Sequence, residues 1–204
     1  MKKLIATLIA LSFAISSAPS AIAADPYVSK WGTFKAQTFS GSGDDVIELP
    51  AAVKAGFITA EYVGESNFVI WSLDTSLAQS GLLVNTIGSY SGLSEFGFSY
   101  GSKKTKAFEV TAEGDWSITV RPISSAPKLT SSGSGDGVFK YSGGVPLWKI
   151  THSGDSNFIV WQYCTSGRSN LVVNTIGAYR GTVRGLSGTC VVAVSSEGTW
   201  TIKK

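Results

Sequence analysis

The sequence of 204 residues predicts an all-β protein made of two tandem antiparallel β-sandwich domains, jelly-roll-like and related by internal duplication. The first observation is a motif that occurs twice, because GESNFVIW at residues 64–71 returns as GDSNFIVW at 154–161. The second is a further shared stretch that follows each copy, at 82–92 and at 171–181. The third is that no window has a convincing helical period, while Gly is abundant and charged residues make up only 15%.

The strands of each repeat can be read from the pattern of apolar residues. Residues 57–63 and 147–153 are β-type runs, and each is followed by a turn of the form Gly-[Glu/Asp]-Ser-Asn. The next runs, 68–73 and 158–163, are apolar on both faces, as expected of central strands in a sandwich. The last two strands of each repeat form a hairpin around Glu-Gly. Four tryptophans that recur at strand positions are predicted to lie in the core: Trp71 and Trp161, Trp116 and Trp200.

The first 23 residues are predicted to be a secretory signal peptide. Lys2 and Lys3 precede an apolar run at 4–15, and the small residues at 21–23 (AIA) provide a cleavage signal. The apolar run is short for a membrane span, which takes about 20 residues, so we expect no membrane span after cleavage. An uncleaved N-terminal anchor is the alternative. The expected location is secreted or extracytoplasmic.

The rest of the chain divides into four parts. Residues 24–37 have no counterpart elsewhere and are expected to pack as an arm or an edge strand. Residues 38–123 form repeat 1, and 129–204 form repeat 2. The segment 124–128 is a short linker with a proline, which fits a boundary.

Charge argues against a nucleic-acid partner. The chain has 17 Lys and Arg against 14 Asp and Glu, and removal of Lys2 and Lys3 leaves 15 against 14. A protein that binds the phosphate backbone needs a concentrated positive surface, and this near-neutral composition does not indicate one.

The two cysteines, Cys164 and Cys190, both lie in repeat 2 and are predicted to form a disulfide, because an exported chain can be oxidised. Alignment of the repeats places Asp74 opposite Cys164 and Lys106 opposite Cys190. We therefore expect a partly buried ion pair between Asp74 and Lys106. The alternative is that the thiols stay free and the alignment is wrong by one residue.

The residues capable of catalysis or metal binding form no recognisable set. His152 is the only histidine, no nucleophile-elbow motif is present, and His152 is expected to be a surface strand residue. One histidine and two oxidised cysteines cannot supply a zinc site. Several acids adjoin glycines, and we expect them to cap turns, with calcium binding as the alternative and no other cofactor. These acids are Asp44, Asp45, Glu65, Asp136 and Asp155.

Three aromatic residues are the candidates for ligand binding. Tyr90 and Tyr179 recur after Ile-Gly, where a strand ends, and Trp148 replaces Ile58 of repeat 1. Flat aromatic rings at loop ends can stack on sugars. The alternative is that the two tyrosines close the end of the sandwich with a backbone hydrogen bond.

The doubled motif resembles a repeat of uncharacterised exported bacterial proteins. In that family Gly-x-Ser-Asn-Phe-x-x-Trp precedes a Leu-Val-Asn-x-Ile-Gly-x-Tyr-x-Gly stretch and a Glu-Gly-x-Trp hairpin, and the resemblance covers nearly the whole chain after residue 23. The family implies no established activity. The unit is also loosely similar, in size and strand pattern, to bacterial pre-peptidase C-terminal domains.

The expected function is that of a non-enzymatic exported binding module that acts at or outside the cell surface. A glycan is the expected ligand, by analogy with other exported β-sandwiches. The alternative is a structural or protein-interaction component of the cell envelope. An exported hydrolase is the third reading, and it lacks a convergent acid, base and nucleophile.

Overall fold

A computed structural model describes residues 24–98 and 104–204. The predicted signal peptide, 1–23, lies outside the described residues. In the described ranges, no helix has the length and apolar character needed to cross a bilayer.

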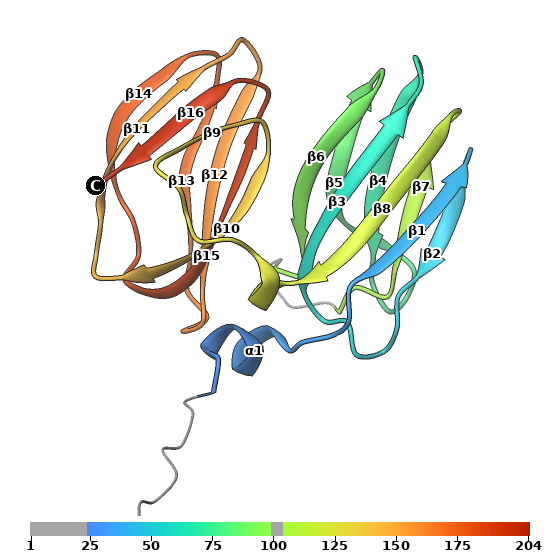
Figure 1. The fold of residues 1–204 in the computed structure, drawn as a ribbon, viewed down its shortest axis with the longest axis horizontal. Helices are drawn as coiled ribbons and strands as arrows, with labels where there is room; N and C mark the ends of the chain where they lie inside the picture. The colour runs from blue at the N-terminus through green and yellow to red at the C-terminus, as the bar shows by residue number, and fades with distance from the viewer. Residues whose placement is uncertain (1–23, 99–103) are drawn as a thin grey trace, which may run out of the picture.

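Repeat 1 folds into a sandwich of two four-stranded antiparallel sheets (Figure 1). Its strands are β1 (Gln37–Ser42), β2 (Asp45–Glu48), β3 (Gly56–Val63), β4 (Asn67–Leu73), β5 (Gln79–Ile87), β6 (Tyr90–Phe96), β7 (Ala107–Thr111) and β8 (Asp115–Pro122). The sheets have the orders β1-β8-β3-β6 and β2-β7-β4-β5. This is the strand order of an eight-stranded jelly roll.

Repeat 2 has the same topology. Its strands are β9 (Ser132–Ser134), β10 (Gly137–Gly143), β11 (Leu147–Ser153), β12 (Asn157–Cys164), β13 (Ser169–Ile176), β14 (Tyr179–Arg184), β15 (Gly188–Ser196) and β16 (Thr199–Lys203). Its sheets are β14-β11-β16-β9 and β10-β15-β12-β13, so each strand matches the one eight places earlier. The prediction of two duplicated all-β sandwiches is confirmed.

The central strands β4 and β12 bury one face and not two. Phe68 and Ile70 are fully buried in the core of repeat 1, whereas Trp71 points to the other side of the sheet and is half-buried. Trp161 of β12 is placed in the same way. The prediction that Trp71 and Trp161 belong to the core is therefore wrong, because strand alternation turns them outward.

Trp116 and Trp200, by contrast, are buried as predicted, and a glycine makes room for each ring. The Trp116 indole donates to the carbonyl of Gly43 at 2.8 Å. A Cβ on Gly41 would lie 2.5 Å from the Trp116 ring, so a larger residue there would displace the ring. The Gly-Ser-Gly stretch that opens each repeat thus serves the packing of this tryptophan.

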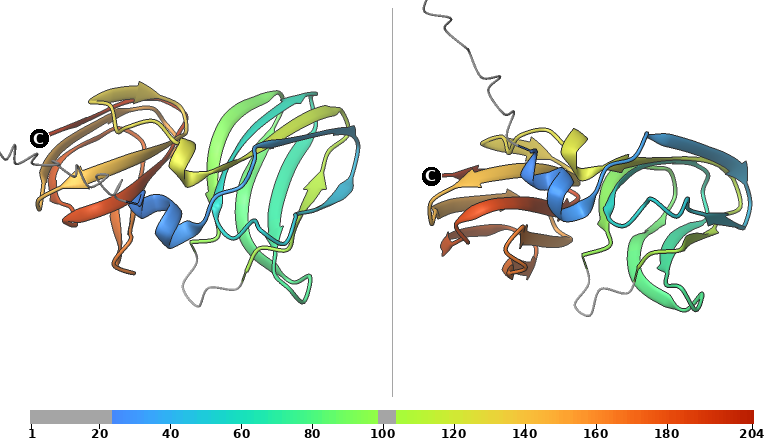
Figure 2. Two further views of the ribbon diagram at one scale, coloured as in Figure 1. Left: turned by 60° about the horizontal axis from the view of Figure 1, so that its bottom comes forward. Right: turned by 90° about the horizontal axis from the view of Figure 1, so that it is seen from below.

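The arm at 24–37 is neither an edge strand nor extended throughout, because it contains a short helix, α1 (Pro26–Trp31). Asp25 caps α1, and its side chain accepts a hydrogen bond from the amide of Tyr27. The helix lies against the junction of the two sandwiches (Figure 2), beside a 3₁₀ turn, η1 (Ile123–Ser125). A third cluster of buried residues joins α1, η1 and both repeats: Tyr27, Trp31, Ala55, Phe57, Ile123, Ala126, Val138 and Val191. The repeats are therefore held together by an apolar contact of their own.

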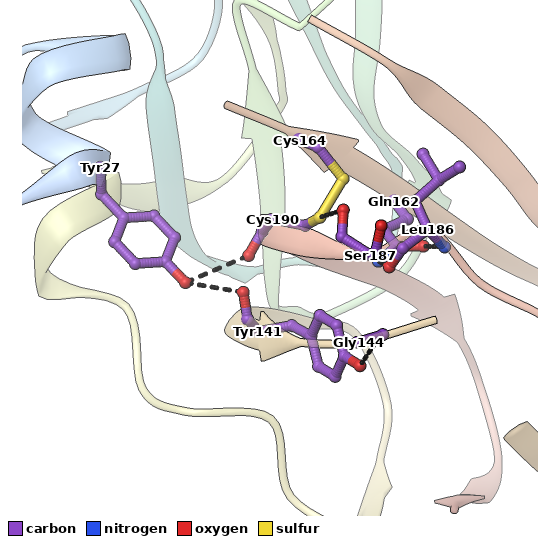
Figure 3. Close-up of a disulfide and its surroundings, with 8 residues drawn as sticks. All are labelled: Tyr27, Tyr141, Gly144, Gln162, Cys164, Leu186, Ser187 and Cys190. Carbon is purple, nitrogen blue, oxygen red and sulfur yellow. Dashed lines mark hydrogen bonds between the residues drawn. A yellow bond between two sulfur atoms is a disulfide. The ribbon is translucent and has the colours of Figure 1, made fainter. Parts of the chain in front are cut away.

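The predicted disulfide between Cys164 and Cys190 is confirmed. The two residues are paired directly between β12 and β15, with Cα atoms 3.9 Å apart. Figure 3 shows Tyr27 reaching the same place, where its hydroxyl donates to the carbonyls of Tyr141 and Cys190 at 2.9 and 3.3 Å. The helix is thus anchored to the disulfide-bearing sheet.

The partner predicted for Lys106 is corrected. Its ammonium lies 3.3 Å from the carboxylate of Glu48 on the neighbouring strand, and both side chains are largely exposed. Asp74 is buried, and its Oδ1 accepts hydrogen bonds from the amide and hydroxyl of Ser76 at 2.8 and 2.6 Å. The long, flexible lysine side chain reaches an exposed carboxylate. The two charges therefore keep most of their hydration, which a buried ion pair would lose.

Candidate functional site

A polar groove of about 440 Å³ runs between the two repeats. One wall comes from the end of β5 and the start of β6 in repeat 1, and the other from three turns of repeat 2. Its lining is formed by Leu83, Val84, Asn85, Thr86, Ser89, Tyr90 and Ser91, and by Gly135, Asp136, Ser156, Asn157, Ser195, Ser196 and Glu197. Hydroxyl, amide and carboxylate groups therefore predominate in the lining.

The wall from repeat 1 is shaped by a tight turn between β5 and β6. Gly88 has φ +86°, a conformation that favours glycine, and its amide donates to the carbonyl of Ser66 at 3.0 Å. The turn leaves Asn85 and Ser89 exposed and Thr86 half-buried. The side chains of Asn85 and Thr86 are available to a molecule in the groove, while the hydroxyl of Ser89 already donates to the carbonyl of Gly64 at 3.3 Å.

Asp136 holds the other wall and links it to the first. Its Oδ1 accepts the amide of Ser196 at 2.9 Å, which caps the β15–β16 turn as expected. Its Oδ2 accepts the hydroxyl of Tyr90 at 2.7 Å, a contact across the two repeats. One carboxylate thus has a local and a long-range role.

Tyr90 lines the groove and is held in place by contacts on both sides of the junction. Its ring packs on the core of repeat 1, 6.0 Å from Phe68 between ring centroids. Burial is the largest cause that raises the pKa of Tyr90 above its ordinary value of 10.0, and the charge of Asp136 and the hydrogen bond to it raise the pKa further. Tyr90 is therefore a neutral hydrogen-bond donor throughout the physiological range.

A second tyrosine–acid pair crosses the same contact. Tyr163 of repeat 2 donates to Glu95 Oε1 at 3.2 Å, and its ring stacks on Phe98 with centroids 4.7 Å apart. Burial raises the pKa of Glu95 from 4.5 to about 7, and the nearby charge of Asp136 acts in the same direction. The contact between the repeats therefore contains two acids whose mutual repulsion depends on pH.

Tyr179 occupies the position of Tyr90 in repeat 2 but has a different environment. It is half-buried and packs 6.1 Å from Phe158, while its hydroxyl has no hydrogen-bond partner among the described residues. The expectation of a backbone hydrogen bond is corrected for Tyr90, whose partner is a side chain of the other repeat.

Trp148 is not a surface ring. It is 1% exposed and packs edge-on against Tyr141 at 5.3 Å, so neither face can stack on a sugar. It lines a larger cavity of about 630 Å³, whose lining also includes Lys128, Lys140, Lys203 and Lys204. The hydroxyls of Tyr27 and Tyr141 in this cavity are already bound to backbone carbonyls. We therefore regard the polar groove as the better candidate for a binding site.

His152 is a packing residue and not the surface residue that was expected. It is 5% exposed, and its ring stacks on Phe158 at 4.3 Å. Its Nδ1 lies 2.9 Å from the carbonyl of Gly177, to which it donates when that nitrogen carries the proton. In the part of the chain that the structure describes, no three His, Cys, Asp or Glu side chains gather as a metal site.

Sequence reasoning missed the wall that repeat 2 contributes. The sequence predicts turns at Asp136, Ser156 and Asn157, of which Asn157 begins β12, and this prediction leaves out their shared surface. The available signal was that both repeats keep these residues together with Asn-Thr-Ile-Gly-x-Tyr. The contact between the repeats brings these separate stretches to one groove.

A comparison of the chain with protein-family models finds no match, and a comparison with curated protein sequences finds none either.

Proposed function

We propose that the protein is an exported binding module that holds a glycan in the groove between its two repeats. The observation that carries this proposal is the lining of the groove, where exposed Asn85, Ser89 and Asn157 lie beside the hydroxyl of Tyr90 and the carboxylate of Asp136. The fold alone would not support it, since jelly rolls serve many functions.

The chemistry of the lining suits a sugar. Each sugar hydroxyl both donates and accepts a hydrogen bond, and side-chain amides and hydroxyls can do the same in return. Asp136 and Glu197 add acceptors, and the partly buried Leu83 adds apolar area for the C–H face of a ring. The volume lies within the range of small-molecule sites, roughly 300–1,000 Å³.

Export fits this role. The Cys164–Cys190 disulfide is of the kind that persists in oxidising compartments, outside the cytoplasm, where envelope glycans are found. The predicted signal peptide at 1–23 would deliver the chain there.

The test is a pair of matched double variants. Asn85→Ala with Thr86→Ala removes two polar side chains of the groove, and Asn174→Ala with Thr175→Ala removes the equivalent pair of repeat 2, which does not line it. Ligands are first sought on a glycan array and on isolated cell wall, and affinities are then measured by calorimetry. At about 1 kcal/mol for each lost hydrogen bond, we expect the first pair to weaken binding at least ~10-fold.

The variant of repeat 2 should bind the same glycan with unchanged affinity in dilute solution. Equal losses in both variants would mean that the site lies elsewhere. If the parent protein retains no glycan at all, the proposal is wrong.

A further inference from the structure

The two repeats contact each other through different faces. Repeat 1 contributes the outer face of β3 and β6, with Phe57, Leu93 and Glu95. Repeat 2 contributes the outer face of β10, β15 and β12, with Val138 and Val191. Both repeats have the same fold, so repeat 2 has a face equivalent to the β3–β6 face of repeat 1. Repeat 1 in turn has a face equivalent to the β10–β15–β12 face of repeat 2.

On repeat 1, the counterpart of the face used by repeat 2 is partly uncovered in the described residues, because Ala107 and Leu73, which stand where repeat 2 has Val191 and Tyr163, are themselves buried. Val46 stands where repeat 2 has Val138, and Trp71 stands where it has Trp161. Val46, Glu109, Trp71 and Leu82 form one row across the sheet, since each is paired with the next. Val46 is 52% exposed, whereas Val138 in the covered face is 1% exposed.

On repeat 2, the counterpart of the face used by repeat 1 is likewise uncovered. Leu147 stands where repeat 1 has Phe57, and it is 64% exposed against 4% for Phe57. Val145 stands where repeat 1 has Ala55, and it is 49% exposed. Figure 1 places β14 of this face at one end of the molecule and β2 of the other face at the opposite end.

We propose that copies of this chain associate head to tail, with repeat 2 of one copy bound to repeat 1 of the next. The contact places Leu147 and Val145 of one copy against Val46 and Trp71 of the next, on the counterparts of the faces that bring Phe57 and Ala55 together with Val138 inside the chain. An arrangement of this kind is heterologous and leaves a free face at each end, so it can continue into a filament.

Polar residues at this contact support the same pairing. In the chain, Tyr90 donates to Asp136 Oδ2 while Asp136 Oδ1 accepts an amide. Asp44, the counterpart of Asp136, accepts the amide of Ala112 at 3.0 Å through its own Oδ1. Its Oδ2 is thus placed to receive the hydroxyl of Tyr179 from the neighbouring copy.

Charge favours this contact more than it favours the internal one. Glu95 of repeat 1 lies near the acid Asp136, and the two repel. Arg184 takes the place of Glu95 on β14 and would face Asp44 of the next copy. Attraction therefore replaces repulsion between the copies.

Association would also build a second groove. Asn174, Thr175 and Tyr179 reproduce the wall of repeat 1, and Ser66 with Asn67 of the next copy reproduce that of repeat 2. This would explain why both repeats contain these residues, although only one copy of each lines the groove inside a single chain. The association itself requires no glycan, so it can hold even if the groove has another ligand.

The contact between copies should be weaker than the internal contact. Helix α1 and η1 complete the apolar cluster at the internal contact only, and Tyr27 anchors them there. The association is therefore expected to depend on protein concentration.

The test is sedimentation velocity of the purified protein over a range of concentrations up to ~1 mM, where a weak complex with a free energy of about −4 kcal/mol is half formed. The parent protein should form species larger than a monomer as its concentration rises. Val46→Asp blocks one face and Leu147→Asp the other, and neither touches the core because both side chains are more than half exposed. Each variant alone should remain a monomer.

A mixture of the two variants distinguishes head-to-tail association from any symmetric dimer. Each variant keeps the face that the other lacks, so the equimolar mixture should form a dimer and no longer species. Val63→Asp is the matched control, since Val63 is 73% exposed, and it should associate like the parent. A parent protein that stays monomeric throughout, or a mixture that forms no dimer, would overturn the proposal.

Discussion

Tyr90 and Tyr179 share one position in the duplicated unit, yet only Tyr90 has a partner for its hydroxyl in the chain. The difference comes from the neighbouring repeat, because repeat 2 places Asp136 2.7 Å from the hydroxyl of Tyr90, while among the described residues the hydroxyl of Tyr179 has no hydrogen-bond partner. At the scale of single residues, the tyrosine hydroxyl therefore links the two repeats in one copy and makes no such link in the other.

Replacement of each tyrosine by phenylalanine tests this difference. Tyr90→Phe removes a hydrogen bond to a carboxylate and leaves Asp136 Oδ2 without its donor, so it should lower the free energy of unfolding by about 1–3 kcal/mol. Tyr179→Phe should change it by less than ~0.5 kcal/mol, since no partner is lost. Denaturant unfolding of both variants at neutral pH and low protein concentration measures the two values, and equal losses would contradict the assignment.

At the scale of elements, the β12–β15 pair is the only strand pair in the described residues with a covalent link. The equivalent β4–β7 pair has Asp74 and Lys106 at these positions, and the two side chains use other partners. The sandwich of repeat 1 thus forms without any such link. The disulfide stabilises a sheet whose topology does not require it.

The double variant Cys164→Ala with Cys190→Ala should fold and lose stability. A cross-link over a loop with a sequence separation of 26 is worth about 3.5 kcal/mol by the loop-entropy relation. We expect the free energy of unfolding, measured with guanidinium, to fall by about that amount, and a reducing agent should reproduce the loss in the parent protein. A loss smaller than ~0.5 kcal/mol would show that native packing alone holds β12 to β15.

At the scale of the whole molecule, the contact between the repeats should respond to pH. Glu95 has a pKa raised to about 7 by burial, from an ordinary value of 4.5 that it regains on unfolding. Between these two pH values the folded protein binds more protons than the unfolded chain does, so stability falls as the pH rises from about 4.5 to about 7 and then levels off.

Glu95→Gln should remove this decline. Glutamine keeps an acceptor for the hydroxyl of Tyr163 but carries no charge, so the variant should be more stable than the parent at pH 8 by about 1–2 kcal/mol and no more stable at pH 4. Thermal unfolding across this range provides the measurement. A parallel pH dependence in parent and variant would show that Glu95 does not titrate near neutrality.

The sequence by itself determined the duplication, the all-β class, most of the strands and the disulfide. Apolar residues at alternate positions and Gly-rich turns act locally, so Phe68 and Trp116 identify their own strands and packing. The alternation of side chains along β4 also implies that Trp71 points away from the core that Phe68 and Ile70 face. The sequence did not reveal this, because the residues on both faces of the strand are apolar.

Only the tertiary structure decided what the two repeats do to each other. Asp136 and Tyr90 are 46 residues apart, and Asp44 and Tyr179 lie in the same repeated motifs. The difference arises when apolar faces of the two sandwiches are buried against each other, which places one copy of each residue in a groove and leaves the other at an end of the molecule. The pattern of apolar residues shows which face of a sheet is apolar. Whether that face is buried depends on the repeat that packs against it, because the stabilisation comes from apolar surface removed from water.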